Sequence, residues 1–229
     1  MILLTSLGCG VSSCATPGTS SFGYTEPAAD TVKNEIVVSK PFSDAWDVLV
    51  GELAKSFFVI NNVEKASRII NVSFSTDNPK DYVDCGRSKR TFEMDQESAV
   101  YEYAVSESSS FKLAAKWGPL NNLPAVMNVF RKPSLEGRVN IYVAPKDNST
   151  VVTANARFVF SVKSSGIAEY RNAFGTVERT TPIPEKVYSI SFNTNQIASA
   201  DWGTPQQPNI LKCRSSGLLE SQILKMVTQ

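Results

Sequence analysis

The chain has 229 residues, of which 42% are hydrophobic and 20% charged, enough to form one substantial core with short appendages. Lysine and arginine total 23 against 22 aspartate and glutamate, so no net field attracts nucleic acid or an anionic membrane. Histidine is absent, which excludes Ser-His-Asp and Cys-His catalysis as well as His-ligated metal sites. We therefore expect a protein that is not an enzyme and that uses no cofactor and no metal.

A lipidation motif is predicted near the amino end. Residues 2–11 are mostly apolar or small and are too few to span a bilayer. The tetrad Val11-Ser12-Ser13-Cys14 follows them and resembles a bacterial lipobox, in which an aliphatic residue and two small ones precede a lipidated cysteine. The resemblance implies that residues 1–13 are the remnant of a signal peptide and that Cys14 carries an acyl anchor. Ala15 behind it implies the outer membrane, on its periplasmic side; the alternative is an ordinary buried thiol.

The first elements after this motif are a tether, a strand and a helix. Residues 14–33 are rich in proline, glycine, serine, threonine and alanine, a composition that favours a flexible tether. Residues 34–40 indicate a strand that ends before Pro41. From Ser43 onward, apolar residues recur at helical spacing from Trp46 to Phe57, which predicts an amphipathic helix with Trp46 in the core.

Beyond the helix the pattern is that of strands, with alternating polar and apolar residues and many β-branched or aromatic ones. The predicted strands are residues 68–75, 98–105, 137–143, 151–162 and 186–192. The polar, proline-marked residues 144–150 predict a turn that joins two of them in an antiparallel hairpin. The basic run Arg87-Ser88-Lys89-Arg90 follows a glycine and is interpreted as a solvated loop.

A closing helix is predicted at the carboxyl end. Leu219, Ile223, Met226 and Val227 share one helical face, with Gly217 as the expected cap. The order strand, helix, several antiparallel strands, helix predicts an α+β fold. We expect a single helix-grip domain over residues 34–229, in which the amino-terminal and carboxyl-terminal helices pack on one face of a curved sheet.

The lipobox resemblance also leads to a prediction about two further cysteines. If the protein is exported, Cys9 is removed with the signal peptide and Cys14 is acylated, Cys85 and Cys213 are the remaining pair in an oxidising compartment, and they become a candidate disulfide. Two free thiols are the alternative. A metal site is less favoured, because both other ligands would have to be carboxylates.

Residues 39–53 (SKPFSDAWDVLVGEL) and 59–74 (VINNVEKASRIINVSF) resemble the repeated unit of the helix-grip domains in BamC lipoproteins, accessories of the outer-membrane β-barrel assembly machinery. The phrases at 82–86 and 212–220 look like signatures of uncharacterised bacterial lipoproteins with a related architecture. BamC carries two such domains and a long segment for partner binding, whereas this chain has one predicted domain and a short tether. The resemblance implies a fold and an envelope location, and it leaves the task open.

Two arrangements of chemical side chains have ordinary explanations. Ser109 with Lys112 has the spacing of a serine–lysine nucleophile, but it lies in a polar connection between strands. Asp77, Asp81 and Asp84 could hold calcium, yet no glycine-containing loop of the EF type surrounds them. We interpret both as solvated.

One stretch, residues 116–132 (KWGPLNNLPAVMNVFRK), is too irregular for a strand and too apolar for an idle loop. The structural interpretation is a short helix that begins near Pro124 and plugs one end of the sheet. The functional interpretation is a lid or docking surface for a partner or ligand. Its members are Trp117, Leu120, Leu123, Met127 and Phe130.

These observations support two hypotheses about function. The first is a non-catalytic outer-membrane lipoprotein whose domain engages an envelope protein partner. The second is a carrier or binding domain for a lipid or a small hydrophobic ligand. Binding to the membrane through Cys14 is common to both, and neither involves nucleic acid.

Overall fold

The computed structural model describes residues 18–94, 96–118, 123–172, 175–202 and 209–229. Strands dominate these ranges. In the amino-terminal half they are β1 (Thr19–Thr25), β2 (Glu35–Val38), β3 (Val59–Glu64), β4 (Ile69–Thr76), β5 (Val83–Asp84), β6 (Arg87–Met94), β7 (Glu97–Ala104) and β8 (Ser109–Trp117). In the carboxyl-terminal half they are β9 (Leu123–Lys146), β10 (Ser149–Arg171), β11 (Val177–Asn193), β12 (Ala198–Asp201) and β13 (Ile210–Ser215). The helices are α1 (Phe42–Lys55), α2 (Leu218–Met226) and the short 3-10 helix η1 (Pro79–Asp81).

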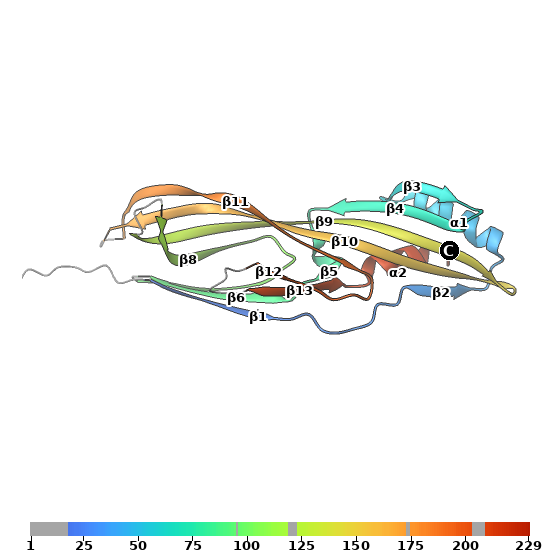
Figure 1. The fold of residues 1–229 in the computed structure, drawn as a ribbon, viewed down its shortest axis with the longest axis horizontal. Helices are drawn as coiled ribbons and strands as arrows, with labels where there is room; N and C mark the ends of the chain where they lie inside the picture. Colours follow the sequence, from blue (N-terminus) through green and yellow to red (C-terminus); the bar gives the residue numbers. More distant parts are fainter. Residues whose placement is uncertain (1–17, 95, 119–122, 173–174, 203–208) are drawn as a thin grey trace, which may run out of the picture.

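The prediction of an α+β helix-grip fold is wrong. The described ranges form three antiparallel sheets, and the two α-helices have only 14 and 9 residues and gather at one end of an elongated molecule (Figure 1). The error has a physical cause. Each element predicted from its period is present, but β9, β10 and β11 are far longer than the alternating segments that predicted them, so the molecule extends well past the helices.

The central element of the fold is the hairpin of β9 and β10, whose strands have 24 and 23 residues. At about 3.4 Å per residue each strand spans roughly 80 Å, which sets the length of the molecule. The predicted turn near residues 144–150 is confirmed, since the pairing starts at Lys146 with Ser149. Alternate residues are buried from Arg131 to Val143 of β9 and from Thr150 to Val162 of β10, as the period of two requires.

At the helical end, β2 pairs with β10, and β4 and β3 extend the sheet beside β9. Helix α1 buries the predicted stripe, with Trp46, Leu49 and Leu53 in the core. The helix ends at Lys55, so Phe57, which the pattern placed on that stripe, is exposed. The predicted closing helix is confirmed as α2. Neither α-helix in the described ranges is long and apolar enough to cross a membrane.

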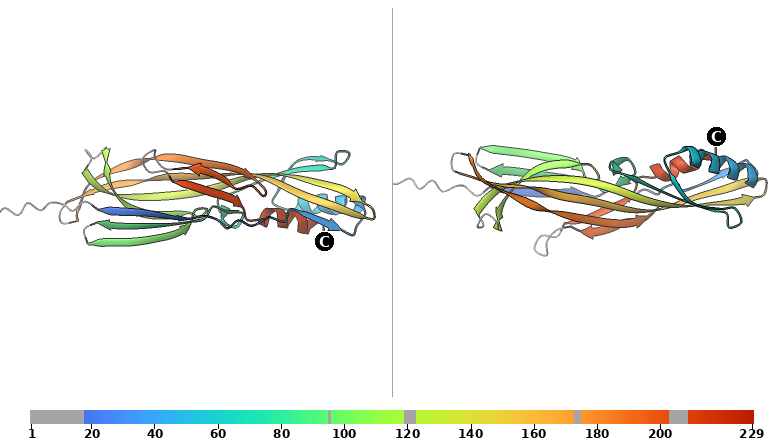
Figure 2. Two further views of the ribbon diagram at one scale, coloured as in Figure 1. Left: turned by 60° about the horizontal axis from the view of Figure 1, so that its bottom comes forward. Right: turned by 90° about the horizontal axis from the view of Figure 1, so that it is seen from above.

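The opposite end consists of two β layers (Figure 2). In one layer β8 pairs with β9, and β11 pairs with β10 along the outer half of the hairpin. The other layer is the sheet β1-β6-β7. The third sheet, β12-β13-β5, connects this end with the helical end. The space between the two layers is where the candidate site lies.

Part of the expected tether is a strand. Residues 19–25 form β1, which pairs with β6 over its whole length from Thr19 with Glu93 to Thr25 with Arg87. The composition of the segment indicates little apolar burial, and six of its seven residues are exposed, Tyr24 being the partly buried one. Pairing with an existing strand edge supplies the backbone hydrogen bonds that such a segment cannot obtain from a core of its own.

The stretch 116–132 contains no plugging helix among its described residues. Residues 109–117 of β8 pair with residues 123–131 of β9, so the stretch forms the end of a hairpin. Prolines make this part of β9 difficult to recognise as a strand from the sequence. Pro133 falls between the last partner of β8, Arg131, and the first partner of β4, Leu135, where β9 has a neighbour on one edge only. A missing N–H is tolerated at such a position.

Candidate functional site: a cavity between two β layers

A cavity of about 390 Å³ lies between the two layers, away from the helices. Its walls come from β1, β6 and β7 on one side and from β8 to β11 on the other, with β13 and residues beside it completing the lining. Many of its side chains are apolar or aromatic: Phe22, Phe111, Met127, Tyr188, Trp202 and Leu211. A concave, mainly apolar space of this size is typical of small-molecule sites, which range over roughly 300–1,000 Å³.

Arg90 of β6 lies between two aromatic rings in this cavity. Its guanidinium carbon is 4.6 Å from the ring centroid of Phe22, its cross-strand neighbour on β1, and 4.4 Å from that of Phe111 on β8. Its Nε donates a hydrogen bond of 2.9 Å to the hydroxyl of Tyr103, whose ring stacks on Phe111. Arg90 therefore contacts two aromatic rings and the hydroxyl of a third.

Arg131 of β9 is a second cation at the cavity and is only 9% exposed. Its guanidinium lies 5.0 Å from the ring centroid of Tyr103, and it donates to the carbonyl oxygen of Val105 at 3.0 Å and to Oγ of Ser109 at 3.1 Å. Burial lowers the pKa of Arg131, and the like charge of Arg90 lowers it further, although Tyr103 acts in the opposite direction. Both arginines contact Tyr103, Arg90 through its hydroxyl and Arg131 over its ring, so the two positive charges are neighbours.

The lining carries positive charge without negative charge. Arg90, Arg131 and Lys186 line the cavity, and none of its lining residues is an aspartate or a glutamate. Within the described ranges, no carboxylate lies within salt-bridge distance of either arginine. The side-chain oxygen of Asn209, which also lines the cavity, is buried and receives no hydrogen bond from those same ranges. Buried polar groups without partners are uncommon, and a bound molecule or a water would satisfy them.

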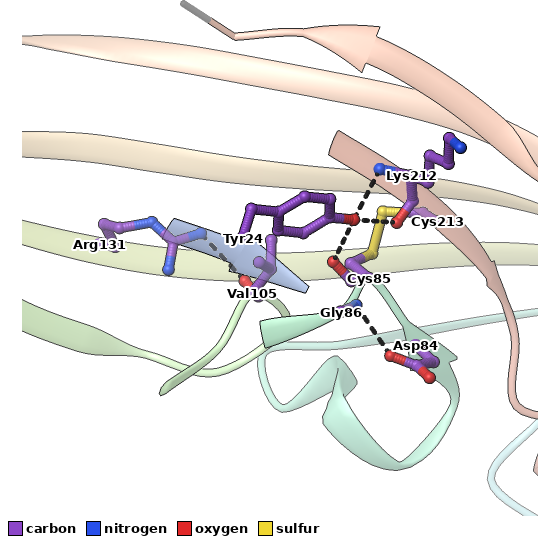
Figure 3. Close-up of a disulfide and its surroundings, with 8 residues drawn as sticks. All are labelled: Tyr24, Asp84, Cys85, Gly86, Val105, Arg131, Lys212 and Cys213. Carbon is purple, nitrogen blue, oxygen red and sulfur yellow. Dashed lines mark hydrogen bonds between the residues drawn. A yellow bond between two sulfur atoms is a disulfide. The ribbon is translucent and has the colours of Figure 1, made fainter. Parts of the chain in front are cut away.

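A disulfide supports the wall of the cavity (Figure 3). Cys85 and Cys213 are bonded, as predicted, and both are fully buried. The hydroxyl of Tyr24 accepts a hydrogen bond of 2.9 Å from the backbone N–H of Lys212, and the carbonyl oxygens of Cys85 and Lys212 both lie 3.1 Å from it. Burial raises the pKa of Tyr24, while the Lys212 backbone contact opposes this and Glu26 raises it further. Strand β1 is thereby fixed across the disulfide.

The disulfide is connected to Arg131 through backbone contacts, the last of which, between Arg131 and Val105, is drawn in Figure 3. Gly86, next to Cys85, accepts a hydrogen bond of 2.9 Å at its carbonyl oxygen from the N–H of Val105. Val105 in turn accepts from Arg131. Gly86 has a φ of 75°, and a Cβ there would lie 2.2 Å from the carbonyl oxygen of Thr25, so only glycine fits between β1 and the disulfide.

The surface residues predicted from sequence do not act as one patch. Met127 lines the cavity and is partly buried, whereas Leu123 and Phe130 are exposed on β9. Trp117 ends β8, but its side chain lies outside the described part of the chain. Leu120 and the lipidation candidate Cys14 also lie outside the described residues.

Sequence reasoning missed the two arginines. The run containing Arg90, interpreted as a solvated loop, is strand β6, with Arg87 and Lys89 exposed and Ser88 buried on the opposite face. The alternation of Ser88, Arg90 and Phe92 on one face was the available signal. Nothing in the sequence indicates that Arg90 and Arg131 face the same space, because they belong to different layers.

The structure does not bring the other side chains selected from the sequence together into a site. Ser109 and Lys112 lie three apart on a strand and therefore on opposite faces; Lys112 pairs with Glu97. Asp84 accepts a hydrogen bond from the backbone N–H of Gly86. In the ranges that the structure describes, no group of three or more metal-binding side chains lies together.

A larger groove of about 540 Å³ lies beside α2, but it is a weaker candidate. Its lining mixes charges of both signs, among them Asp30, Asp84 and Lys225. Arg214, its most buried cation, donates to the backbone oxygens of Ala28 and Asp30 and so holds the segment after β1 in place. The groove therefore offers its most buried cation as a structural group, and its lining contains charges of both signs, unlike that of the cavity between the layers.

Comparisons with protein-family models, with curated proteins and with solved structures gave no match.

Proposed function

We propose that the chain is a non-catalytic binding protein that holds a small ligand with an apolar body in the cavity between the two β layers. The observation that carries this proposal is the cavity itself, with its apolar and aromatic lining and a volume suited to one small molecule. The exposed lining side chains, Phe22, Pro184 and Lys186, belong to β1 and β11, so a ligand would enter past them.

The lining also supports binding in preference to catalysis. Ser88 and Ser164 contribute hydroxyl groups to the cavity, but the chain has no histidine and the lining has no carboxylate to activate them. Histidine and carboxylates are the usual bases that activate a serine, and the lining contains neither. The polar groups are thus suited to orienting a ligand.

The proposed setting is the periplasmic side of the outer membrane, with an acyl anchor at Cys14. The disulfide between Cys85 and Cys213 supports an oxidising compartment, because such bonds persist outside the reducing cytosol. Mass spectrometry of the protein, expressed with an export signal, would find an acylated Cys14 if this is right. A mature protein that still contains residues before Cys14, with an unmodified Cys14 thiol, would contradict the anchor.

Mass spectrometry of the natively purified protein also tests the binding function. We expect a small molecule to copurify, and we expect Met127→Trp, which fills the cavity from β9, to lose it. Leu123→Trp is the matched control, because Leu123 lies on the same strand at an exposed position. Equal recovery of the molecule from both variants would contradict binding in this cavity.

An envelope protein partner remains a second proposal. Phe130, which is 45% exposed on β9, offers apolar contact there, as a docking surface requires. Pull-down from envelope extracts with Phe130→Ser would lose a specific partner that Met127→Trp retains. Loss with neither variant would refute this surface.

A further inference from the structure

We infer that the ligand of this cavity is an amphipathic organic anion, whose oxyanion head group binds Arg90 and Arg131 while its apolar body lies against the aromatic lining. The inference rests on the proposed function and specifies the chemical class of its ligand. The head group is a carboxylate or a phosphate, since each has two oxygens that can accept hydrogen bonds from one guanidinium group.

The first step of the argument is the geometry of Arg90. Two aromatic rings lie 4.6 Å and 4.4 Å from its guanidinium carbon, and neither carries a negative charge that would neutralise it. One of these N–H groups, on Nε, donates to Tyr103. The two terminal nitrogens make no hydrogen bond within the described ranges, although each carries donors. They are available in the plane where oxyanions bind guanidinium groups.

The second step is the cost of the buried charge. Arg131 is almost fully removed from water, and its partners are a backbone carbonyl, a hydroxyl and an aromatic ring, none of which is charged. A buried charge without a counter-charge is expensive, and the neighbouring Arg90 adds repulsion. A bound anion would compensate both cations at once, so the ligand supplies what the fold lacks.

The third step is the surroundings of the two cations. Met127, Val129, Ile183, Tyr188 and Leu211 line the rest of the same cavity, so a ligand bound to the arginines extends along apolar walls. An inorganic ion would leave these walls without contact. Lys186 is exposed in the lining and adds attraction for an anion during entry.

Calorimetric titration with three probes of equal chain length tests the inference: decanoate, decyl phosphate and the neutral decanol. We expect the intact protein to bind at least one of the anions about tenfold or more tightly than decanol, because charge-assisted hydrogen bonds form only with the anions. Decanoate against decyl phosphate identifies the head group. Arg90→Met should abolish the preference while decanol binding is retained, and Arg90→Lys should restore part of it.

Arg87→Met is the matched control, since Arg87 lies on the same strand as Arg90 but is exposed on the opposite face. It should leave every affinity unchanged. Arg131→Met gives a second test if its far-ultraviolet spectrum is native. Equal affinity of the intact protein for anions and decanol, or an unchanged preference in Arg90→Met, would overturn the inference and leave the proposed function standing. Failure to bind any probe would refute both.

Discussion

Removal of the disulfide should lower the free energy of unfolding by about 5 kcal/mol. The bridge joins residues with a sequence separation of 128, and in the chain-entropy model such a loop restricts the denatured chain by about 17 cal/mol/K, or about 5 kcal/mol at 25 °C. The variant is Cys85→Ala with Cys213→Ala. Both side chains are fully buried, so the lost sulfur atoms add a packing cost of about 1 kcal/mol.

Urea unfolding followed by circular dichroism measures this effect. The slope of free energy against urea should rise in the double variant, because an unbridged denatured chain exposes more surface. Wild type reduced with dithiothreitol is the control that keeps the sulfur atoms and removes the bridge. A loss below about 1 kcal/mol in the reduced protein, with an unchanged slope, would refute the reasoning that the bridge acts through the denatured chain.

Three further predictions concern local structure. Gly86→Ala should lower the free energy of unfolding in urea by about 2 to 4 kcal/mol, because its Cβ would lie 2.2 Å from a backbone atom. Gly175 has a similar positive φ and nothing within 4 Å of an added Cβ, so Gly175→Ala should cost about 1 kcal/mol in the same assay. Equal costs would contradict the packing argument. Gly51→Ala in the interior of α1, also with nothing within 4 Å, should raise the melting temperature through a gain of about 0.5 to 1 kcal/mol, and a lower value would count against it. The hydrogen bond from Lys112 lowers the pKa of Glu97, and the positive charge of Lys112 lowers it further. The Glu97 carboxylate therefore stabilises the fold at pH values above its ordinary pKa of about 4.3, and this stabilisation is lost as the pH falls through the lowered pKa. Stability measured from about pH 5 to pH 3 should fall less in Glu97→Gln than in wild type, by under about 1 kcal/mol because the pair is partly exposed, and parallel curves would refute the linkage.

Local periodicity predicted the elements well where one face is buried along the whole element. The spacing of Trp46, Leu49 and Leu53 gives α1, and the alternation on both sides of residues 144–150 gives the hairpin of β9 and β10. The disulfide followed from the expected compartment. These features depend on neighbours within a few residues, or on a simple choice among few cysteines.

The fold class failed because strand length and layer count depend on pairing between distant segments. Pro124 indicates an irregular segment when read alone, yet it lies in β9, which pairs with β8 at this position and with β10 from Val126 onward. Segment 19–25 has no core of its own and becomes ordered only by pairing with β6. Without β1, the layer that faces the long hairpin, and with it the cavity, could not be anticipated.

The candidate site was hidden for the same reason. Arg90 belongs to a run of charges that is typical of a solvated face, and only the pairing of β6 with β1 and β7 turns it inward. Arg131 follows a predicted surface residue, Phe130, on the opposite face of the same strand. Met127 was selected from sequence as a contact residue, and its place in the cavity keeps that hypothesis open to test.

The central claim is that a ligand binds between the two β layers, and amide chemical shifts of isotope-labelled protein during a titration with decanoate test it most directly. The account predicts saturable shifts at Arg90, Tyr103 and Met127, with the amides of α1 and α2 unchanged. Shifts confined to the helical end, or an absence of shifts at saturating decanoate, would contradict it.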